Sequence, residues 1–308
     1  MNEKRVDVLV LGSGIAGITA GIYLRRGNIS CLLLDKDAPG GKLNNIHLID
    51  NYPGLPNISG PDFAMALVNQ ANELGIEFEY GEVASINKQE DGVFLVKTDN
   101  GDFVCSALIV ATGVINPPAG VPNERAFLGK GVSYCATCDG NFFKGKDVLV
   151  YGYKDHAVED AIYLSSIVNK VYFLHNSPLE TPDSHLRTLE EKSNIAIIEG
   201  KLLGLEGEGK VESAKILVEG KEEAISISAA FPLSGEVSSS QFLSGLGVLN
   251  TNGFIHVNEA METNVEGIYA CGDIIKKKLR QLVNAAGEGA VAANSAISYI
   301  HSLRRKAK

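Results

Sequence analysis

The clearest pattern of hydrophobic positions occurs twice along the chain, at an offset of 140 residues. In each copy a short run of apolar residues, beginning at Val8 and at Val148, is followed by a turn and then by apolar residues at helical spacing. The copies share seven identical residues over 17 positions, including the Ile-Tyr-Leu triplets that end at Leu24 and Leu164. A strand, a turn and a helix form the first part of a βαβ unit. Two such starts predict an α/β protein with two doubly wound, Rossmann-like domains of three layers.

Length and composition agree with two globular domains. The chain has 308 residues, of which 45% are hydrophobic and 21% are charged, and at about 150 residues per domain this length accommodates two cores. The apolar fraction excludes a disordered chain, and no run approaches the roughly 18 apolar residues of a membrane span. The formal net charge of −9 argues against general nucleic-acid binding. We therefore expect a soluble, cytoplasmic protein that binds neither nucleic acid nor membranes.

The turn of the first copy is a complete Gly-x-Gly-x-x-Gly motif, formed by Gly12, Gly14 and Gly17. The first glycine permits the tight turn, the second leaves room for a diphosphate, and the third lets the helix pack closely on the strand. The N–H groups at the start of the helix then face the phosphates. The next apolar run ends at Asp35, 18 residues after Gly17, where a carboxylate can accept hydrogen bonds from ribose hydroxyls. The first copy therefore predicts a dinucleotide-binding site.

The second copy departs from this motif at the positions that a nucleotide needs most. Lys154 stands at the position of Gly14, so a long side chain replaces bare backbone, and Asp155 follows it. We expect Asp155 to act as an N-cap and so to compete with a phosphate for the helix N-terminus. His175 occupies the position of Asp35, and the residues after it offer neither an acid for a ribose nor an arginine pair for a 2′-phosphate. A lysine can attract phosphate, so the charge of this turn does not by itself decide whether a nucleotide binds. The bulk of Lys154 and the missing ribose contacts predict that this domain binds no nicotinamide nucleotide tightly.

Two of the five cysteines, Cys135 and Cys138, form a Cys-x-x-Cys pair. Two intervening residues let the thiols close a small disulfide ring that opens and closes readily. Structural zinc is the competing interpretation, but such a site normally needs four ligands and the sequence has no second Cys-x-x-Cys. A structural loop disulfide is disfavoured in a cytosolic protein. The other cysteines lie within or beside apolar runs, where buried, inert thiols are expected; they are Cys31, Cys105 and Cys271.

These motifs, in this order, make essentially the whole chain resemble the low-molecular-weight thioredoxin reductases. Besides the glycine motif, the matching stretches are residues 40–44, 50–54, 111–113, 133–140, 269–273, 280–281 and 285–289. The resemblance implies a FAD-binding domain built from both ends of the chain, interrupted by a central domain that carries the redox cysteines. We place the FAD domain at residues 1–115 and 242–308, and the central domain at residues 116–241. The resemblance further implies a homodimer with thioredoxin as its substrate.

The same resemblance assigns residues to FAD and to the redox centre. The FAD set is Gly12, Ser13, Gly14, Ile15, Ala16, Gly17, Asp35, Lys36, Gly41, Lys42, Leu43, Asn51, Ala111, Thr112, Gly113, Gly272, Asp273, Arg280, Gln281 and Leu282. At the redox centre, Cys138 is implied to lie against the flavin and Cys135 to attack the disulfide of thioredoxin. Asp139 is implied to protonate the leaving thiolate, which requires a raised pKa. A carboxylate that only caps a nearby backbone N–H is the alternative interpretation of Asp139. No metal is expected.

Two departures from the family pattern bear on the electron donor. Lys42 replaces the usual third residue of the Gly-Gly-Gln motif, and the central domain lacks the glycine motif and the His-Arg-Arg phosphate clamp, of which only His175 remains. With the redox cysteines retained, this combination resembles the branch that uses no pyridine nucleotide, most of all the ferredoxin-dependent flavin thioredoxin reductases. We therefore expect reduced ferredoxin rather than NADPH as the donor. The alternatives are an NADPH-dependent thioredoxin reductase with an altered nucleotide site and a flavin-dependent dithiol oxidase. One candidate docking patch for an acidic ferredoxin is formed by Lys276, Lys277, Lys278 and Arg280. The basic run at residues 304–308 is another, with a solvated tail as its alternative interpretation.

Overall fold

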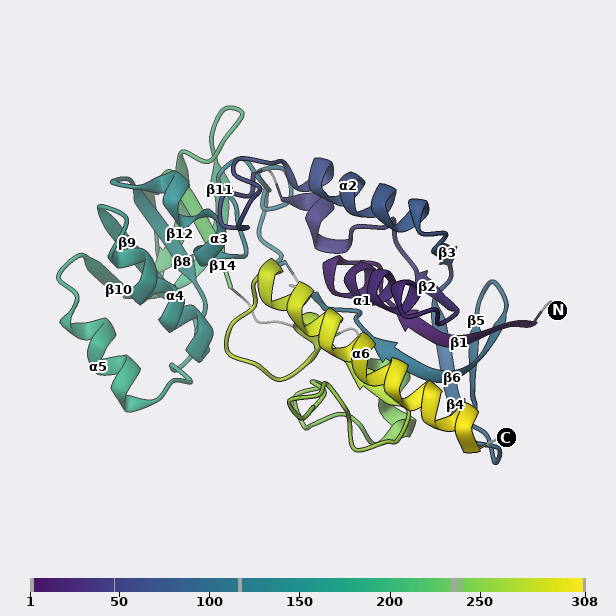
Figure 1. The fold of residues 1–308 in the computed structure, drawn as a ribbon. Coiled ribbons are helices and arrows are strands. Elements are labelled where there is room, and N and C mark those ends of the chain that lie inside the picture. The colour runs from purple at the N-terminus through teal and green to yellow at the C-terminus, as the bar shows by residue number, and fades with distance from the viewer. Residues whose placement is uncertain (1–2, 47, 116–117, 234–236, 239, 307–308) are drawn as a thin grey trace. The chain divides into compact units, whose positions relative to one another are not determined.

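The computed structural model describes residues 3–46, 48–115, 118–233, 237–238 and 240–306, and the chain divides into two compact units. The first unit contains Met1–Ile115 and Ser238–Lys308, and the second contains Asn116–Val237 (Figure 1). The chain returns to the first unit after Val237, whereas the sequence analysis places this boundary after residue 241. Two short strands, β7 (Val114–Ile115) and β15 (Val237–Ser238), pair with each other.

A seven-stranded sheet forms the centre of the first unit. Its strand order is β3-β2-β1-β6-β5-β4, and the long strand β6 pairs with β5 along its first half and with β16 along its second half. Strand β6 is buried along most of its length and β1 over its last four residues, Val8–Leu11, as expected for central strands, which explains the apolar sequences of these stretches. The strands are β1 (Glu3–Leu11), β2 (Cys31–Asp35), β3 (Glu77–Tyr80), β4 (Val83–Lys88), β5 (Phe94–Thr98), β6 (Asp102–Val110) and β16 (Ile268–Ala270).

Successive residues of β1 enter two different cores, as the period of a strand requires. Val8 and Val10 lie in the core that the sheet shares with helices α1 (Ile15–Arg26), α2 (Gly60–Glu73) and α6 (Leu282–Lys306). Leu9 and Leu11 lie in the opposite core, which is closed by apolar residues of the segment 243–275. This segment contains two short 3-10 helices, η3 (Gln241–Leu246) and η4 (Gly272–Ile274). Helix α6 packs along α1, so the end of the chain lies beside its beginning (Figure 1).

The second unit repeats this design with a smaller sheet. Four parallel strands have the order β10-β9-β8-β14, and helices α4 (Asp155–Ser165) and α5 (Asp183–Glu191) share a core with one of its faces. A three-stranded antiparallel sheet contributes to the core on the other face. The parallel strands are β8 (Asp147–Tyr151), β9 (Lys170–His175), β10 (Ile195–Glu199) and β14 (Ala229–Pro232), and the antiparallel ones are β11 (Lys201–Glu206), β12 (Ser213–Val218) and β13 (Lys221–Ser226). The prediction of two Rossmann-like, layered α/β domains is confirmed.

The predicted repeat corresponds to β1–α1 in the first unit and to β8–α4 in the second. In the second unit, a one-turn helix α3 (Ala136–Asp139) and the 3-10 helix η2 (Gly140–Phe143) lie just before β8. Of the helices in the described ranges, none is both long and apolar enough to cross a bilayer.

Candidate cofactor and redox sites

The first and third glycines of the motif are required by close backbone contacts. Gly12 follows β1 and has a φ of +103°, in the region that disfavours L side chains, and a Cβ there would lie within 3.0 Å of the backbone of Ala111. A Cβ on Gly17 would come equally close to the carbonyl oxygen of Gly12. Glycine at these two positions therefore lets α1 pack against the end of β1 and lets the turn after β6 approach the loop.

Gly14 differs from both, because its own backbone does not require glycine. It is the N-cap residue of α1, with an ordinary φ of −71°, and no described atom lies within 4 Å of the place where its Cβ would be. No side chain of the described residues caps the helix N-terminus, and its first turn carries no acid. Open space beside uncapped N–H groups is what a diphosphate needs. The loop therefore fits the diphosphate of FAD, the cofactor expected here.

Asp35, at the end of β2, holds this loop in place. Its Oδ2 accepts hydrogen bonds from the backbone N–H of Ser13 at 2.6 Å and from the Ser13 hydroxyl at 2.7 Å. The neighbouring Lys36 is exposed and forms a surface ion pair with Glu82. The residues after β2 come back to the loop, since the N–H of Gly40 donates to the carbonyl of Ser13 at 2.8 Å. The 3-10 helix η1 (Gly41–Asn45), which contains buried Leu43, begins there.

The C-terminal part of the first unit reaches the same helix end. A Cβ on Gly289 of α6 would lie within 3.0 Å of the carbonyl oxygen of Ala16, and a Cβ on Gly272 would lie 3.0 Å from the Ala16 side chain. Gly272 has a φ of +76° and its N–H donates to Glu288 at 2.9 Å. The two ends of the chain therefore meet at the start of α1. That both ends contribute to one cofactor site stays a prediction.

Lys42 takes part in an ion-pair network with Asp273. The Lys42 ammonium lies 3.7 Å from one oxygen of Asp273, and Lys277 lies 3.4 Å from the other. Lys277 also donates to Glu288 at 2.8 Å, and the side chains of both are largely buried. The expectation that Lys277 belongs to an exposed docking patch is therefore wrong, because Asp273 and Glu288 bind it. Sequence reasoning missed Glu288, which is the seventh residue of α6.

Asn51, Arg280 and Gln281, also predicted to hold the cofactor, make contacts of their own. Asn51 donates an amide hydrogen to Gln281 at 3.0 Å, which joins two segments 230 residues apart in sequence. The Arg280 guanidinium lies over the Phe254 ring, 4.9 Å from its centroid. Helix α6 begins at Leu282, the last residue of the predicted cofactor set. The other residues of the predicted FAD set lie at the start of α1 or on the turn after β6; they are Ile15, Thr112 and Gly113.

The redox pair lies in the second unit, in and just before α3. Cys135 and Cys138 form a disulfide, and Cys135 is the N-cap residue whose sulfur accepts the N–H of Cys138 at 3.2 Å. The Thr137 hydroxyl lies 3.5 Å from the same sulfur. Asp139, the last residue of α3, donates its N–H to the carbonyl of Cys135 at 3.1 Å. This turn holds both sulfurs and the predicted acid within five consecutive residues.

The other three cysteines are buried, as predicted. Cys31, Cys105 and Cys271 are at most 7% exposed, and burial raises the pKa of each thiol to about 12. Thiolates are the reactive form of cysteine, so these three are inert at neutral pH. The Cys-x-x-Cys pair therefore carries the thiol chemistry of the chain.

The second strand–turn–helix differs from the first in its turn and in its helix start. Gly152 follows β8, and a Cβ there would meet the Leu233 carbonyl at 2.6 Å. Lys154, not Asp155, is the N-cap residue of α4, so the expected capping by Asp155 is wrong in detail. Asp155 instead occupies the first helical position. The N–H of Glu180 donates to the carbonyl of Tyr153 at 2.8 Å, so the segment after β9 lies against this turn.

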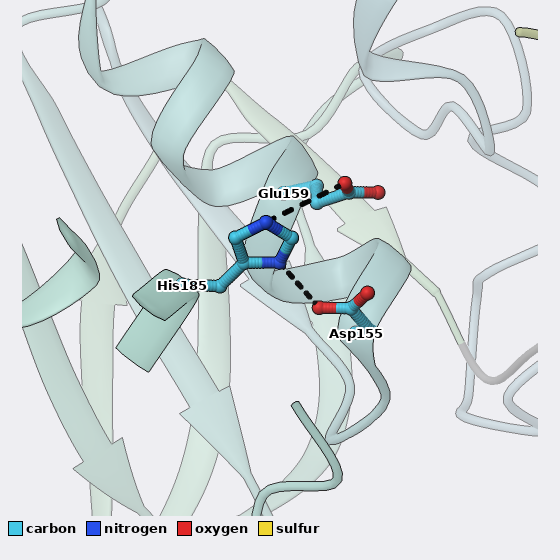
Figure 2. A group of neighbouring side chains, drawn as sticks. All are labelled: Asp155, Glu159 and His185. Atoms are coloured by element: carbon cyan, nitrogen blue, oxygen red, sulfur yellow. Dashed lines mark hydrogen bonds and ion pairs between the residues drawn. The ribbon is translucent and has the colours of Figure 1, made fainter. Parts of the chain in front are cut away.

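Asp155 is engaged by two side chains that sequence reasoning did not connect with it. The Thr181 hydroxyl donates to its Oδ1 at 2.6 Å, and Nδ1 of His185 lies 2.7 Å from the same oxygen. Figure 2 shows His185 reaching from α5 between Asp155 and Glu159, with its Nε2 4.0 Å from Glu159. Burial acts to raise the pKa of Asp155, but the hydrogen bonds from Thr181 and His185 outweigh it and the net shift is downward. The first turn of α4 thus carries an ionised carboxylate that Thr181 and His185 already bind.

One further buried carboxylate, Glu124, was also missed. It is 2% exposed and accepts the N–H groups of Ala119 and Gly120, each at 2.9 Å. Tyr134, the residue before Cys135, donates its hydroxyl to the same carboxylate at 2.9 Å. Burial and Glu124 together raise the pKa of Tyr134, which keeps the hydroxyl protonated as the donor. Glu124 therefore links the segment that enters the second unit to the residue beside the redox pair.

Comparison with known proteins identifies relatives that span the whole chain. The family described as Pyridine nucleotide-disulphide oxidoreductase matches residues 6–289. A thioredoxin reductase of Bacillus subtilis (strain 168) is 36% identical over 311 residues, which cover 99% of this chain and 98% of that protein. The crystal structure of a thioredoxin reductase from Streptococcus pyogenes MGAS5005 has a TM-score of 0.93 at 33% identity, with 98% of this chain and 100% of that chain covered. A ferredoxin-flavin thioredoxin reductase from Clostridium acetobutylicum has a TM-score of 0.54 at 30% identity, with 98% and 100% covered.

These matches include the glycine loop of the first unit and the redox disulfide of the second. The chain is thus a flavoprotein disulfide reductase like thioredoxin reductase, with Cys135 and Cys138 as its redox pair. It belongs to the pyridine nucleotide-disulphide oxidoreductase family, in the low-molecular-weight thioredoxin reductase group.

Proposed function

We propose that this protein transfers electrons from reduced ferredoxin, by way of FAD, to the Cys135–Cys138 disulfide and then to thioredoxin. The observation that carries the choice of donor is the contrast between the two strand–turn–helix copies. Gly14 leaves open space at the start of α1, whereas Lys154 occupies the same N-cap position of α4. A dinucleotide needs that space for its diphosphate.

The surroundings of α4 support the proposal. A phosphate at a helix N-terminus needs free N–H groups and no competing anion. Here the carboxylate of Asp155 lies in the first turn, held by Thr181 and His185, and the residues around Glu180 cover the preceding turn. An additional anion would meet the Asp155 charge at close range, where like charges repel.

The end of β9 offers no substitute for the missing ribose contact. His175 stands where Asp35 stands in the first unit, and its Nδ1 lies 3.0 Å from the carbonyl oxygen of Ser177. In the first unit, by contrast, the acid at the end of β2 binds the loop that leads to the open helix start. Together these differences support nucleotide binding in the first unit alone.

In the proposed reaction FAD supplies one chemical property: it accepts electrons singly and passes them on as a pair. The protein supplies the thiols. In the reduced pair, the Cys135 thiolate attacks the disulfide of thioredoxin and Cys138 then resolves the mixed disulfide. Asp139 provides the proton for the thioredoxin sulfur that leaves when Cys135 attacks. These three roles come from the family resemblance and are consistent with their positions in one turn.

The Clostridium acetobutylicum protein supports ferredoxin as the donor, because it is a ferredoxin-flavin thioredoxin reductase that is 30% identical to this chain. Ferredoxins are usually acidic, so docking on a protein of net charge −9 needs a local basic surface. Lys276 and Lys278, which flank the buried Lys277, are both exposed and follow the Gly272-Asp273 pair. We propose that Lys276 and Lys278, without Lys277, form part of the docking surface. The homodimer expected from the resemblance stays a prediction.

An NADPH-dependent reaction is the second candidate, because the positive charge of Lys154 can attract phosphate. An anaerobic turnover assay tests the choice. Thioredoxin is offered to the enzyme with either reduced ferredoxin or NADPH, and thioredoxin dithiol is measured, with Cys138→Ser as the inactive control. The proposal predicts dithiol formation with ferredoxin and none above background with NADPH. Turnover with NADPH at a rate equal to or above that with ferredoxin would overturn it.

A further inference from the structure

The two sulfurs of the redox disulfide have different surroundings. The Cys135 sulfur accepts the backbone N–H of Cys138 at 3.2 Å and lies 3.5 Å from the Thr137 hydroxyl oxygen. A disulfide sulfur carries no proton, so in this state the hydroxyl is the donor. Within the described part of the chain, no hydrogen bond is directed at the Cys138 sulfur. The local structure therefore distinguishes Cys135 before the disulfide is opened.

We propose that Thr137 is a catalytic residue whose hydroxyl stabilises the thiolate of Cys135 and so makes it the attacking thiol at neutral pH. This inference rests on the proposed function only in naming thioredoxin as the disulfide that is attacked. The physical basis is the strengthening of a hydrogen bond when its acceptor becomes charged. A bond that favours the charged form lowers the pKa of the group that accepts it.

The geometry keeps both donors in place when the disulfide opens. Cys135 is the N-cap residue of α3, and the N–H of Cys138 is the one that an N-cap atom accepts at the third helical position. Ala136, between Cys135 and Thr137, is fully buried and fixes this turn in the core of the second unit. Ser133 also orders the entry to the turn, because its hydroxyl accepts the N–H of Cys135 at 3.0 Å.

The role of Thr137 can be followed through a balanced reaction. The Cys135 thiolate attacks one sulfur of the thioredoxin disulfide, whose S–S bond breaks, and the electron pair leaves on the second thioredoxin sulfur, which is protonated. The Cys138 thiolate then attacks the Cys135 sulfur, the mixed disulfide breaks, and the first thioredoxin sulfur leaves with its electron pair. Two electrons have passed to thioredoxin and the Cys135–Cys138 disulfide has re-formed. Thr137 donates a hydrogen bond to the Cys135 thiolate before its attack and keeps its own proton.

The test measures thiolate formation directly. The full-length protein is reduced chemically under anaerobic conditions, freed of reductant and treated with iodoacetamide across a range of pH, and alkylation of each cysteine is followed by peptide mass spectrometry. Cys31, Cys105 and Cys271 do not interfere, because burial raises the pKa of each to about 12. The variants are Thr137→Val, which keeps the shape without the hydroxyl, Thr137→Ala, and Thr137→Ser, which keeps the hydroxyl.

The inference predicts that Thr137→Val and Thr137→Ala shift the midpoint of Cys135 alkylation upward by about one pH unit, which is about tenfold less thiolate at neutral pH. Thr137→Ser is expected to stay close to the unmodified protein, and the Cys138 midpoint is expected to move little. Loss of the thiolate stabilisation also lowers the reduction potential of the pair by about 30 mV, measured against a glutathione buffer. Superimposable Cys135 profiles for the unmodified protein and Thr137→Ala would overturn the inference, even if Thr137→Val does not fold.

This experiment needs neither ferredoxin nor thioredoxin. A shifted Cys135 profile therefore supports the role of Thr137 even if NADPH proves to be the electron donor. An unshifted profile removes that role even if ferredoxin is the donor.

Discussion

Replacing Gly14 by alanine adds one methyl group at the point where the diphosphate of FAD is expected to meet the start of α1. In the protein without cofactor this methyl group meets no described atom within 4 Å, and the φ of −71° suits alanine. Gly17→Ala is the matched control for packing, because its Cβ would lie within 3.0 Å of the Gly12 carbonyl oxygen. The two substitutions add the same atoms, three residues apart, to different environments.

The expected magnitudes follow from these environments. For Gly14→Ala, the lower entropy of the unfolded chain stabilises the apoprotein by about 0.4–1 kcal/mol, and the poorer N-cap costs about the same amount. The free energy of unfolding of the apoprotein should thus change by less than about 1 kcal/mol. For Gly17→Ala, backbone displacement should cost about 1–3 kcal/mol.

The cofactor affinity should respond in a different way. The Gly14→Ala methyl group keeps the diphosphate away from the N–H groups of α1. Loss of two charge-assisted hydrogen bonds, at about 1.5–3 kcal/mol each, weakens FAD binding by about 3–6 kcal/mol, which is roughly a hundredfold to ten-thousandfold in the dissociation constant.

Two measurements on apoprotein check this reasoning. Urea unfolding gives the stability, and quenching of FAD fluorescence during titration gives the affinity. Gly14→Ala should unfold like the unmodified protein and yet bind FAD at least a hundredfold more weakly. Unchanged FAD affinity in a folded Gly14→Ala variant would refute the placement of the diphosphate at this loop.

Three other substitutions test separate parts of the account. Glu124→Leu leaves the N–H groups of residues 119–121 and the Tyr134 hydroxyl without their shared acceptor, so the free energy of unfolding should fall by about 1.5–3 kcal/mol, whereas a fall under 1 kcal/mol in urea would contradict this role. Reversing Lys276 and Lys278 to Glu should slow flavin reduction by ferredoxin severalfold at low salt while leaving stability unchanged, and an unaltered rate would remove this surface from consideration. The pKa of Asp155 lies below its ordinary value of 3.8, so its contribution to stability is present above that value and is lost as the pH falls below it. The urea midpoint of Asp155→Asn should therefore depend less on pH in this acidic range than that of the unmodified protein, and parallel curves would contradict the assignment.

The sequence predicts the features that depend on short-range chemistry. The glycines of the first loop, the apolar strands and the Cys-x-x-Cys pair each follow from neighbours within a few residues, and the motif order carries the family. The two-domain fold was predictable for the same reason, because strand, turn and helix recur as one pattern at Val8 and at Val148.

The contacts that sequence reasoning missed join residues far apart along the chain. His185 reaches Asp155 across 30 residues, and Tyr134 reaches Glu124 from the other end of a loop. A single sequence contains no periodic signal for such pairs, since each partner is a polar residue that could equally face solvent. Lys277 was assigned to the surface for this reason: three consecutive lysines indicate an exposed run, and only the fold brings Asp273 and Glu288 around the middle one.

The central proposal is that the contrast between Gly14 and Lys154 leaves the chain with one dinucleotide site, so that a protein rather than NADPH supplies the electrons. The most direct test is the flavin absorbance of the FAD-loaded enzyme under anaerobic conditions. One sample of the enzyme is mixed with excess NADPH, and a separate sample is mixed with reduced ferredoxin. The account predicts that the flavin stays oxidised and yellow with NADPH and is bleached by ferredoxin. Rapid bleaching by NADPH would contradict it.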